Sequence, residues 1–140
     1  PDKPLLPAEI EQRYLARELA YAIATELHAP LNVPVLKYLK TEYGQDQEGV
    51  NTWYRHWLAR TLVPVEQRLA QLDTGDFLFD TPGFFEVVLM PQIYNARRFG
   101  YDFSDAPHTT RIEAACLALD AVQRAHPDNQ NDTPEGETVQ

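Results

Sequence analysis

LMPQIYNARRF, the segment from Leu89 to Phe99, ends an otherwise uncharged run with two adjacent arginines. Glu86 is the only other charged residue between Thr81 and Phe99. At about 100° per residue, the apolar side chains here go right round a helix, and such a helix is usually buried. A guanidinium at its edge is costly unless partners or water satisfy the donors. The arginine pair is therefore either a structural ion-pair anchor or a receptor for an anion.

Composition restricts the kinds of partner and compartment. The 140 residues suffice for one domain, and 21 acidic against 12 basic side chains give a net charge of −9, which disfavours nucleic acid. No apolar run reaches the ~18 residues of a membrane span. The single cysteine predicts a reducing, cytoplasmic location without an internal disulfide, and the four scattered histidines predict no metal site. Because the chain begins at Pro1 without an initiator methionine, we expect it to be a piece of a longer protein.

The hydrophobic pattern predicts an all-α fold, since no segment alternates like a strand. A first helix is expected from Pro7 to about His28, followed by a break at Ala29-Pro30. A second helix should begin at Pro34 and stop at Gly44.

The second half of the chain predicts four more helical segments. Asp46 should cap a helix from Gln47 to about Leu72, kinked at Pro64. After a loop, the buried helix should start at about Gly83, and further helices are expected over residues 108–119 and from a cap at Asp120 to about residue 126. The polar residues 128–140 should form a disordered acidic tail.

The first predicted helix has two different faces. A core stripe repeats every four residues, at Leu15, Leu19, Ile23 and Leu27. The opposite face carries Tyr14, Tyr21 and His28 rather than a Lys/Glu-rich surface. That face fits an interface with a second body, and it also fits a surface that simply carries two tyrosines.

Several separate motifs, in order, resemble the C-terminal half of zeta-class glutathione S-transferases. They are LLPA at 5–8, ELH at 26–28, VLKYL at 35–39, WYRHW at 53–57 and PQIYNARRF at 91–99, extended by DFS at 102–104 and RIEAACLAL at 111–119. The likeness covers about residues 4–132 and points to the maleylacetoacetate and maleylpyruvate isomerases of that family.

The resemblance implies an architecture and an activity. Residues 4–127 would be the glutathione S-transferase C-terminal-like helical domain. A thioredoxin-like N-terminal domain with the catalytic serine would lie outside this chain, so no catalytic residue is expected here. The family forms homodimers and uses glutathione, whose thiolate adds to the cis double bond of a small dicarboxylate. Rotation and loss of glutathione give the trans isomer, a step in the breakdown of tyrosine and other aromatic compounds.

The resemblance assigns the family's site residues to matching positions in this sequence. Arg98 is similar to an arginine that holds a substrate carboxylate, and a planar guanidinium suits that contact. Without the resemblance, Arg98 would be read as a helix-end cation that gains ~0.3–1 kcal/mol from the macrodipole. Arg97 should instead face a carboxylate of the domain, or solvent.

The resemblance also assigns glutathione contacts to His28 and Asn32. Here the chain departs from the family pattern, because Val33 and Pro34 replace the usual basic or polar residues. The plain alternative for His28 is a helix-terminal or interface histidine.

Other positions favour structural readings. Gly83 stands where relatives have Ser or Thr, but Glu86 should still reach the Gly83 N–H as half of a capping box. The five aromatic residues Trp53, Tyr54, Trp57, Phe84 and Phe85 are expected in the core. Cys116 lies on an inward stripe and should be a buried apolar residue rather than a nucleophile.

Two other functions stay open. Similar helical domains act as non-catalytic interaction modules, and the absence of active-site residues from this chain fits such a role. A general glutathione transferase or a dehalogenating enzyme of the same class is the nearer alternative.

Overall fold

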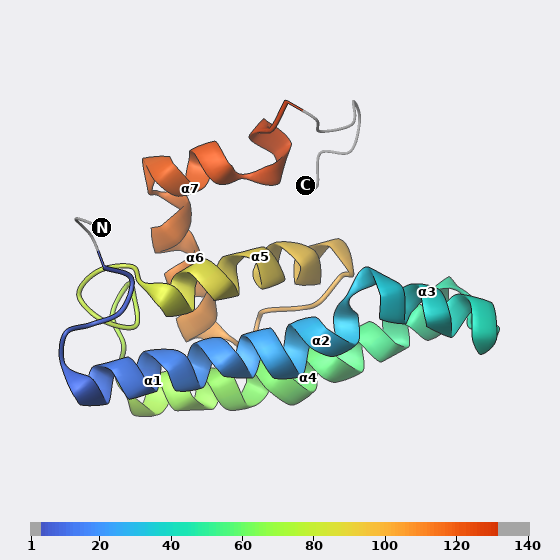
Figure 1. Ribbon diagram of the computed structural model, residues 1–140, viewed down its shortest axis with the longest axis horizontal. Helices are drawn as coiled ribbons and strands as arrows, with labels where there is room; N and C mark the ends of the chain where they lie inside the picture. Colours follow the sequence, from blue (N-terminus) through green and yellow to red (C-terminus); the bar gives the residue numbers. More distant parts are fainter. Residues whose placement is uncertain (1–3, 132–140) are drawn as a thin grey trace.

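The computed structural model describes residues 4–131, and every regular element in that range is a helix (Figure 1). In chain order the elements are α1 Ile10–Tyr21, the π-helix η1 Ala22–Leu27, α2 His28–Leu31, α3 Val33–Glu42, α4 Gln47–Gln71, α5 Phe84–Arg98, α6 Pro107–Leu117, α7 Asp120–Ala125 and the 3-10 helix η2 Pro127–Asn129. The predicted all-α class is confirmed.

The helices pack around one core. The segment from α1 to α2 lies alongside α4, α5 lies over this pair, and α6 contacts both α4 and α5 (Figure 1). In Figure 1, α7 projects from the far end of α6, above α5. The fully buried large side chains come from each of these layers: Ile23, Leu27, Leu58, Leu69, Phe85, Leu89, Ile93 and Ile112.

The first helix differs from the prediction at both ends. It begins at Ile10, and the carboxylate of Glu9 caps it by accepting hydrogen bonds from the Glu11 and Gln12 N–H groups. Pro7 therefore precedes the helix. The expected core stripe is confirmed, with Leu19 buried and Leu15 half-buried.

The expected break at Ala29-Pro30 was wrong, because the chain stays helical through Leu31. Proline lacks an N–H, and its ring crowds the carbonyl four residues earlier, which is that of Glu26. Glu26 lies within η1, where the turn is wider and the His28 N–H reaches back five residues to the Ile23 carbonyl. The wider turn lets the helix pass Pro30 without stopping.

The next two helices largely follow the prediction. Gly44 follows the end of α3 with φ +62°, a left-handed conformation that favours glycine. Asp46 caps α4 by accepting the Gly49 N–H at 2.8 Å, as expected. α4 continues as one helix through Pro64.

The start of α5 is held by a carboxylate of its own first turn and by a carbonyl from the entry segment. The Glu86 carboxylate accepts the Gly83 N–H at 2.7 Å, which confirms the predicted half of the capping box. Its other oxygen accepts the Leu78 N–H from the preceding loop. The Phe84 N–H donates to the Leu5 carbonyl at 2.8 Å, and this approach is possible because Gly83 has no Cβ.

A carboxylate from α4 caps α6. Buried Glu66 accepts hydrogen bonds from the His108 and Thr109 N–H groups and from the Thr109 hydroxyl. These acceptors satisfy donors that a helix N-terminus leaves open.

The last helices are shorter than expected. α6 ends at Leu117. The predicted cap at Asp120 was wrong, because Leu119 occupies the N-cap position of α7 and Asp120 is the first helical residue. Its carboxylate pairs with Arg124 one turn later.

Part of the predicted tail belongs to a regular element. Asp128, its first residue, lies in η2 and accepts a hydrogen bond from the Tyr94 hydroxyl at 3.1 Å. Residues 132–140 of the expected tail lie outside the described range.

We expect Gly83→Ala to lower the free energy of unfolding by about 1–3 kcal/mol, because a Cβ there would lie 2.8 Å from the Leu5 carbonyl oxygen. Chemical denaturation measures the change. Gly75→Ala is the matched control, since a Cβ at Gly75 meets nothing within 4 Å. Equal stability of the two variants would contradict the contact.

Candidate functional site

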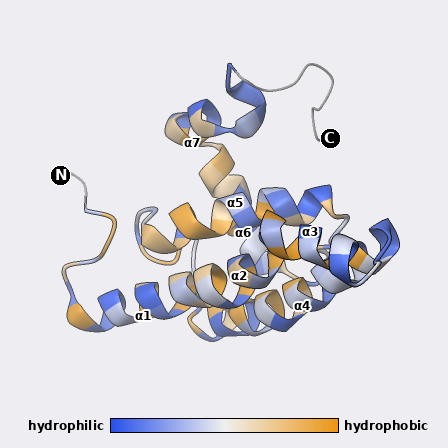
Figure 2. Ribbon diagram, turned by 45° about the vertical axis from the view of Figure 1, so that its right-hand side comes forward, coloured by the Kyte–Doolittle hydropathy of each residue, from blue (hydrophilic) through white to orange (hydrophobic). Residues whose placement is uncertain are grey.

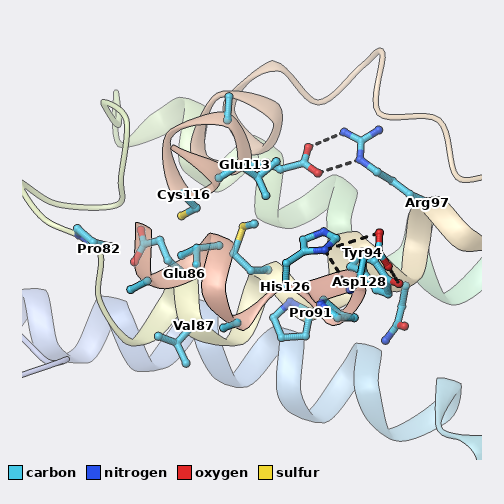
Figure 3. A pocket seen from close by; sticks show the side chains of 18 of the residues that line it. Pro82, Glu86, Val87, Pro91, Tyr94, Arg97, Glu113, Cys116, His126 and Asp128 are labelled. Carbon is cyan, nitrogen blue, oxygen red and sulfur yellow. Dashed lines mark hydrogen bonds and ion pairs between the residues drawn. The ribbon is translucent and has the colours of Figure 1, made fainter. Parts of the chain in front are cut away.

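A groove with a volume of about 1110 Å³ lies between α5, α6, α7 and η2 (Figure 3). Its floor and walls are largely apolar, and Arg97 and Arg98 are among its lining residues. The expectation that α5 is buried on all sides was wrong here, since Val87 is 54% exposed. Figure 2 shows the hydrophobic colour of the first turns of α5. The apolar circumference of α5 thus serves both the core and an open surface.

Arg97 is paired with a carboxylate of the domain itself. Its Nε and one terminal nitrogen donate to the two oxygens of Glu113 on α6, at 2.8 and 2.5 Å, as Figure 3 shows. These hydrogen bonds raise the pKa of Arg97 above its ordinary value. The guanidinium also lies over the Phe103 ring at 5.0 Å. The prediction that Arg97 faces a carboxylate of the domain is confirmed.

Arg98 differs from Arg97 in its partners. Both are exposed and line the groove, but Arg98 makes no hydrogen bond or ion pair with any residue in the range 4–131. Burial raises the pKa of Tyr54 to about 12, and the positive charge of Arg98 partly opposes that rise. Tyr54 itself stacks on Phe99, with ring centroids 3.7 Å apart. Arg98 is therefore a cation held at the groove without a carboxylate partner from the described chain.

Three polar residues connect α5 to the end of the described chain beside the groove. Besides the Tyr94–Asp128 hydrogen bond, the Asp128 N–H donates to His126 Nδ1 at 3.3 Å, and the Tyr94 and His126 rings meet edge to face at 5.4 Å (Figure 3). This cluster was not predicted, because the polar composition from Asp128 onward is typical of a disordered tail.

His28 lies outside the groove lining, on the α2 side of α5. Its Nδ1 is 3.2 Å from the amide nitrogen of Gln92, a nine-tenths buried residue of α5. Gln92 was not among the predicted site residues. One signal could have found it, because it is the only uncharged polar side chain within the apolar stretch Val87–Tyr94 besides the tyrosine hydroxyl.

Asn32 serves as the N-cap of α3. Its Oδ1 accepts the Val35 N–H at 3.0 Å, and its Nδ2 donates to the Ala29 carbonyl at 2.8 Å. The structure therefore places His28 and Asn32 at the two ends of α2 and puts Arg98 separately at the end of α5.

The tyrosine face of α1 is open to solvent in the described chain. Tyr14 and Tyr21 are 63% and 52% exposed, and His28 is exposed as well. The Tyr21 ring meets the Phe84 ring edge to face, so this face adjoins the start of α5.

The five aromatic residues expected in the core differ in burial. Tyr54 and Phe85 are buried, whereas Trp53, Trp57 and Phe84 are half-buried.

Cys116 is buried at the groove wall, and burial raises the pKa of its thiol to about 12, with Glu86 and Glu113 adding to the rise.

Between residues 4 and 131, no group of three or more metal-ligating side chains is arranged so that it could hold an ion. Within the same range no helix is both long and apolar enough to span a bilayer.

Comparison with known proteins gives consistent similarities. Maleylacetoacetate isomerase of Pseudomonas aeruginosa is 36% identical over 134 residues, which cover 96% of this chain and 62% of that protein. The probable maleylacetoacetate isomerase of Vibrio cholerae is 35% identical over 128 residues, 91% of this chain and 60% of that protein. The chain thus spans about three fifths of the length of these curated relatives. No protein-family model matches it.

Solved structures agree. A crystal structure of maleylpyruvate isomerase from P. aeruginosa PAO1 superposes with a TM-score of 0.89 and 40% identity, covering 93% of this chain and 69% of that one. A holo structure of maleyl pyruvate isomerase, a bacterial zeta-class glutathione S-transferase, gives a TM-score of 0.90, 35% identity and coverages of 93% and 62%. Maleylacetoacetate isomerase from Anaeromyxobacter dehalogenans, with bound dicarboxyethyl glutathione and citrate, gives 0.87, 34%, 94% and 59%.

We expect Cys116 to resist alkylation in the folded protein. With a pKa of about 12, about one thiol in ten thousand is the reactive thiolate at pH 8, and this fraction rises tenfold for each pH unit up to about 12. Iodoacetamide labelling followed by mass spectrometry measures the rate. Unfolding in guanidinium is the control and should restore ordinary thiol reactivity; fast labelling of the folded protein would contradict the burial.

Proposed function

Because the chain belongs to the zeta-class glutathione S-transferase family, we propose that it is the C-terminal helical domain of a glutathione-dependent maleylacetoacetate or maleylpyruvate isomerase. The observation that carries the proposal is the guanidinium of Arg98 at the groove, which has no ion-pair partner among residues 4–131 and lies next to an Arg97 that Glu113 already neutralises. In a chain of net charge −9, a guanidinium left open at an apolar groove favours an anionic ligand there.

We assign Arg98 to a substrate carboxylate. Its fork of donors can bind a carboxylate with two parallel hydrogen bonds. The apolar groove wall lowers the local dielectric and strengthens that attraction. A fixed positive charge also stabilises negative charge that develops on the carboxylate side of the substrate during reaction.

Glutathione is the cofactor in this proposal, and it supplies the thiol that adds to the substrate double bond. The described residues fit its polar groups at α2. His28 has a second ring nitrogen, Nε2, that bonds to no residue between 4 and 131, and Asn32 keeps one amide hydrogen beyond its capping bonds. Val33 and Pro34 are exposed beside Asn32 and add no side-chain donor. His28 and Asn32 would hold glutathione, while the catalytic serine belongs to the preceding thioredoxin-like domain.

The proposed protein contains further parts. The face formed by Tyr14, Tyr21 and His28 would dock the thioredoxin-like domain, and the whole enzyme would form a homodimer. Residues 4–127 would make up the helical domain. We place the enzyme in the cytoplasm, in the breakdown of tyrosine and other aromatic compounds, where a single buried thiol is typical of a reducing compartment.

In the full-length enzyme, Arg98→Ala should raise the KM for the dicarboxylate substrate about tenfold or more, because it removes a charge-assisted contact. Steady-state kinetics of glutathione-dependent isomerisation measure the change. Arg98→Lys should fall between the two, since it keeps the charge but loses the fork.

Arg55→Ala is the matched control, because Arg55 is an exposed arginine whose ion pair with Glu48 is also exposed. It should leave the KM unchanged. An unchanged KM in Arg98→Ala would assign Arg98 to structure. Absence of any isomerase activity in the unmodified protein would instead favour the non-catalytic module.

The docking face can be tested by hydroxyl-radical footprinting of the full-length protein. Tyr14 and Tyr21 should be protected relative to Tyr38 and Tyr43 in the same sample, since all four are 52–66% exposed in the helical domain. Equal modification of the four tyrosines would show that α1 does not carry the interface.

A further inference from the structure

The contact between Gln92 and His28 is unusual for its place in the fold. Gln92 is 8% exposed and lies on the buried side of α5, between Leu89 and Ile93 in the core. A buried polar side chain normally has a hydrogen-bonding partner, because desolvating it otherwise costs free energy. The only partner within residues 4–131 is the Nδ1 of His28, a residue 64 positions earlier.

The direction of this hydrogen bond follows from the chemistry of the two groups. An amide NH₂ can donate but has no free lone pair with which to accept. The Gln92 Nε2, 3.2 Å from His28 Nδ1, therefore donates, and Nδ1 accepts. In a neutral imidazole the single ring proton must then be on Nε2. Nε2 faces away from this bond and has no partner in the described chain.

The backbone at His28 is also special. The wider turn of η1 ends there, with the His28 N–H bonded to the Ile23 carbonyl five residues back, and Pro30 follows two positions later. π-helical turns inside α-helices occur frequently at functional sites. Leu27 is buried in the core, so the backbone on one side of His28 is held in place. Gln92 fixes the ring, and η1 fixes its backbone.

We propose that Gln92 is a positioning residue that holds neutral His28 in the Nε2–H form and aims this N–H donor at a carboxylate or peptide carbonyl of glutathione. This inference rests on the glutathione contact of His28 in the proposed function. A donor that is already oriented loses less conformational entropy on binding, so Gln92 contributes to glutathione affinity without touching the ligand.

The first test is spectroscopic and needs no activity. Long-range ¹H–¹⁵N spectra of the full-length protein labelled at histidine, assigned by the signal lost in His28→Ala, should place the His28 proton on Nε2. In Gln92→Glu the carboxylate can only accept, so Nδ1 should become protonated. A proton on Nδ1 in the unmodified protein, or no change in Gln92→Glu, would overturn the positioning role.

The second test is kinetic. Gln92→Met keeps the side-chain length but removes the donor, and it should raise the KM for glutathione about threefold to tenfold, with kcat at saturating glutathione unchanged. In a His28→Ala background the same substitution should add nothing, because the two residues act through one contact. An equal rise in both backgrounds would show a merely structural role for Gln92.

Gln12→Met is the matched control, because Gln12 is an exposed glutamine of α1 whose side chain has no hydrogen bond to the described residues. It should change neither the spectra nor the KM. If His28→Ala itself leaves the KM for glutathione unchanged, the glutathione contact of the proposed function fails. The position of the ring proton tests Gln92 independently of that result.

Discussion

The proposed anion-binding role of this domain depends on the contact in which Arg97 donates two hydrogen bonds to Glu113. It joins the end of α5 to α6 and neutralises one of two adjacent guanidinium groups. Arg98, one residue later on the helix, is rotated by roughly 100° and has no such partner among the described residues. A single buried carboxylate thus turns a symmetric sequence feature, two arginines, into one structural cation and one open cation.

Buried carboxylates have a wider role in this acidic chain. Glu86 joins the preceding loop to the start of α5, Glu66 caps α6 from α4, and Glu113 holds the end of α5. Each accepts two or more hydrogen bonds, which is how a buried charge is tolerated. Glu66 and Glu113 hold helix termini that are distant in sequence, whereas Glu86 holds the start of its own helix.

Sequence reasoning reached the helices whose signals are local. Two such signals depend only on neighbours within a turn or two: the four-residue core stripe, which includes Leu19 and Ile23, and the helix cap at Asp46. Both are confirmed. The pattern failed at two local details that it does not encode: the wider turn of η1 lets the helix continue through Pro30, and Leu119 rather than Asp120 occupies the cap of α7. Gln92 could not be paired with His28 from sequence, because that contact depends on how α2 meets α5.

The Leu5 carbonyl at the start of α5 has a mechanical consequence. The segment that enters the domain also supplies a hydrogen-bond acceptor to a helix roughly 80 positions later. Its ordering therefore closes a long loop, at an entropic cost that grows only slowly with loop length. Proteolytic cleavage between residue 5 and α1 would release that carbonyl and leave the Phe84 N–H without its acceptor. The entry segment therefore acts as a tether between the chain before α1 and the helix that carries Arg98.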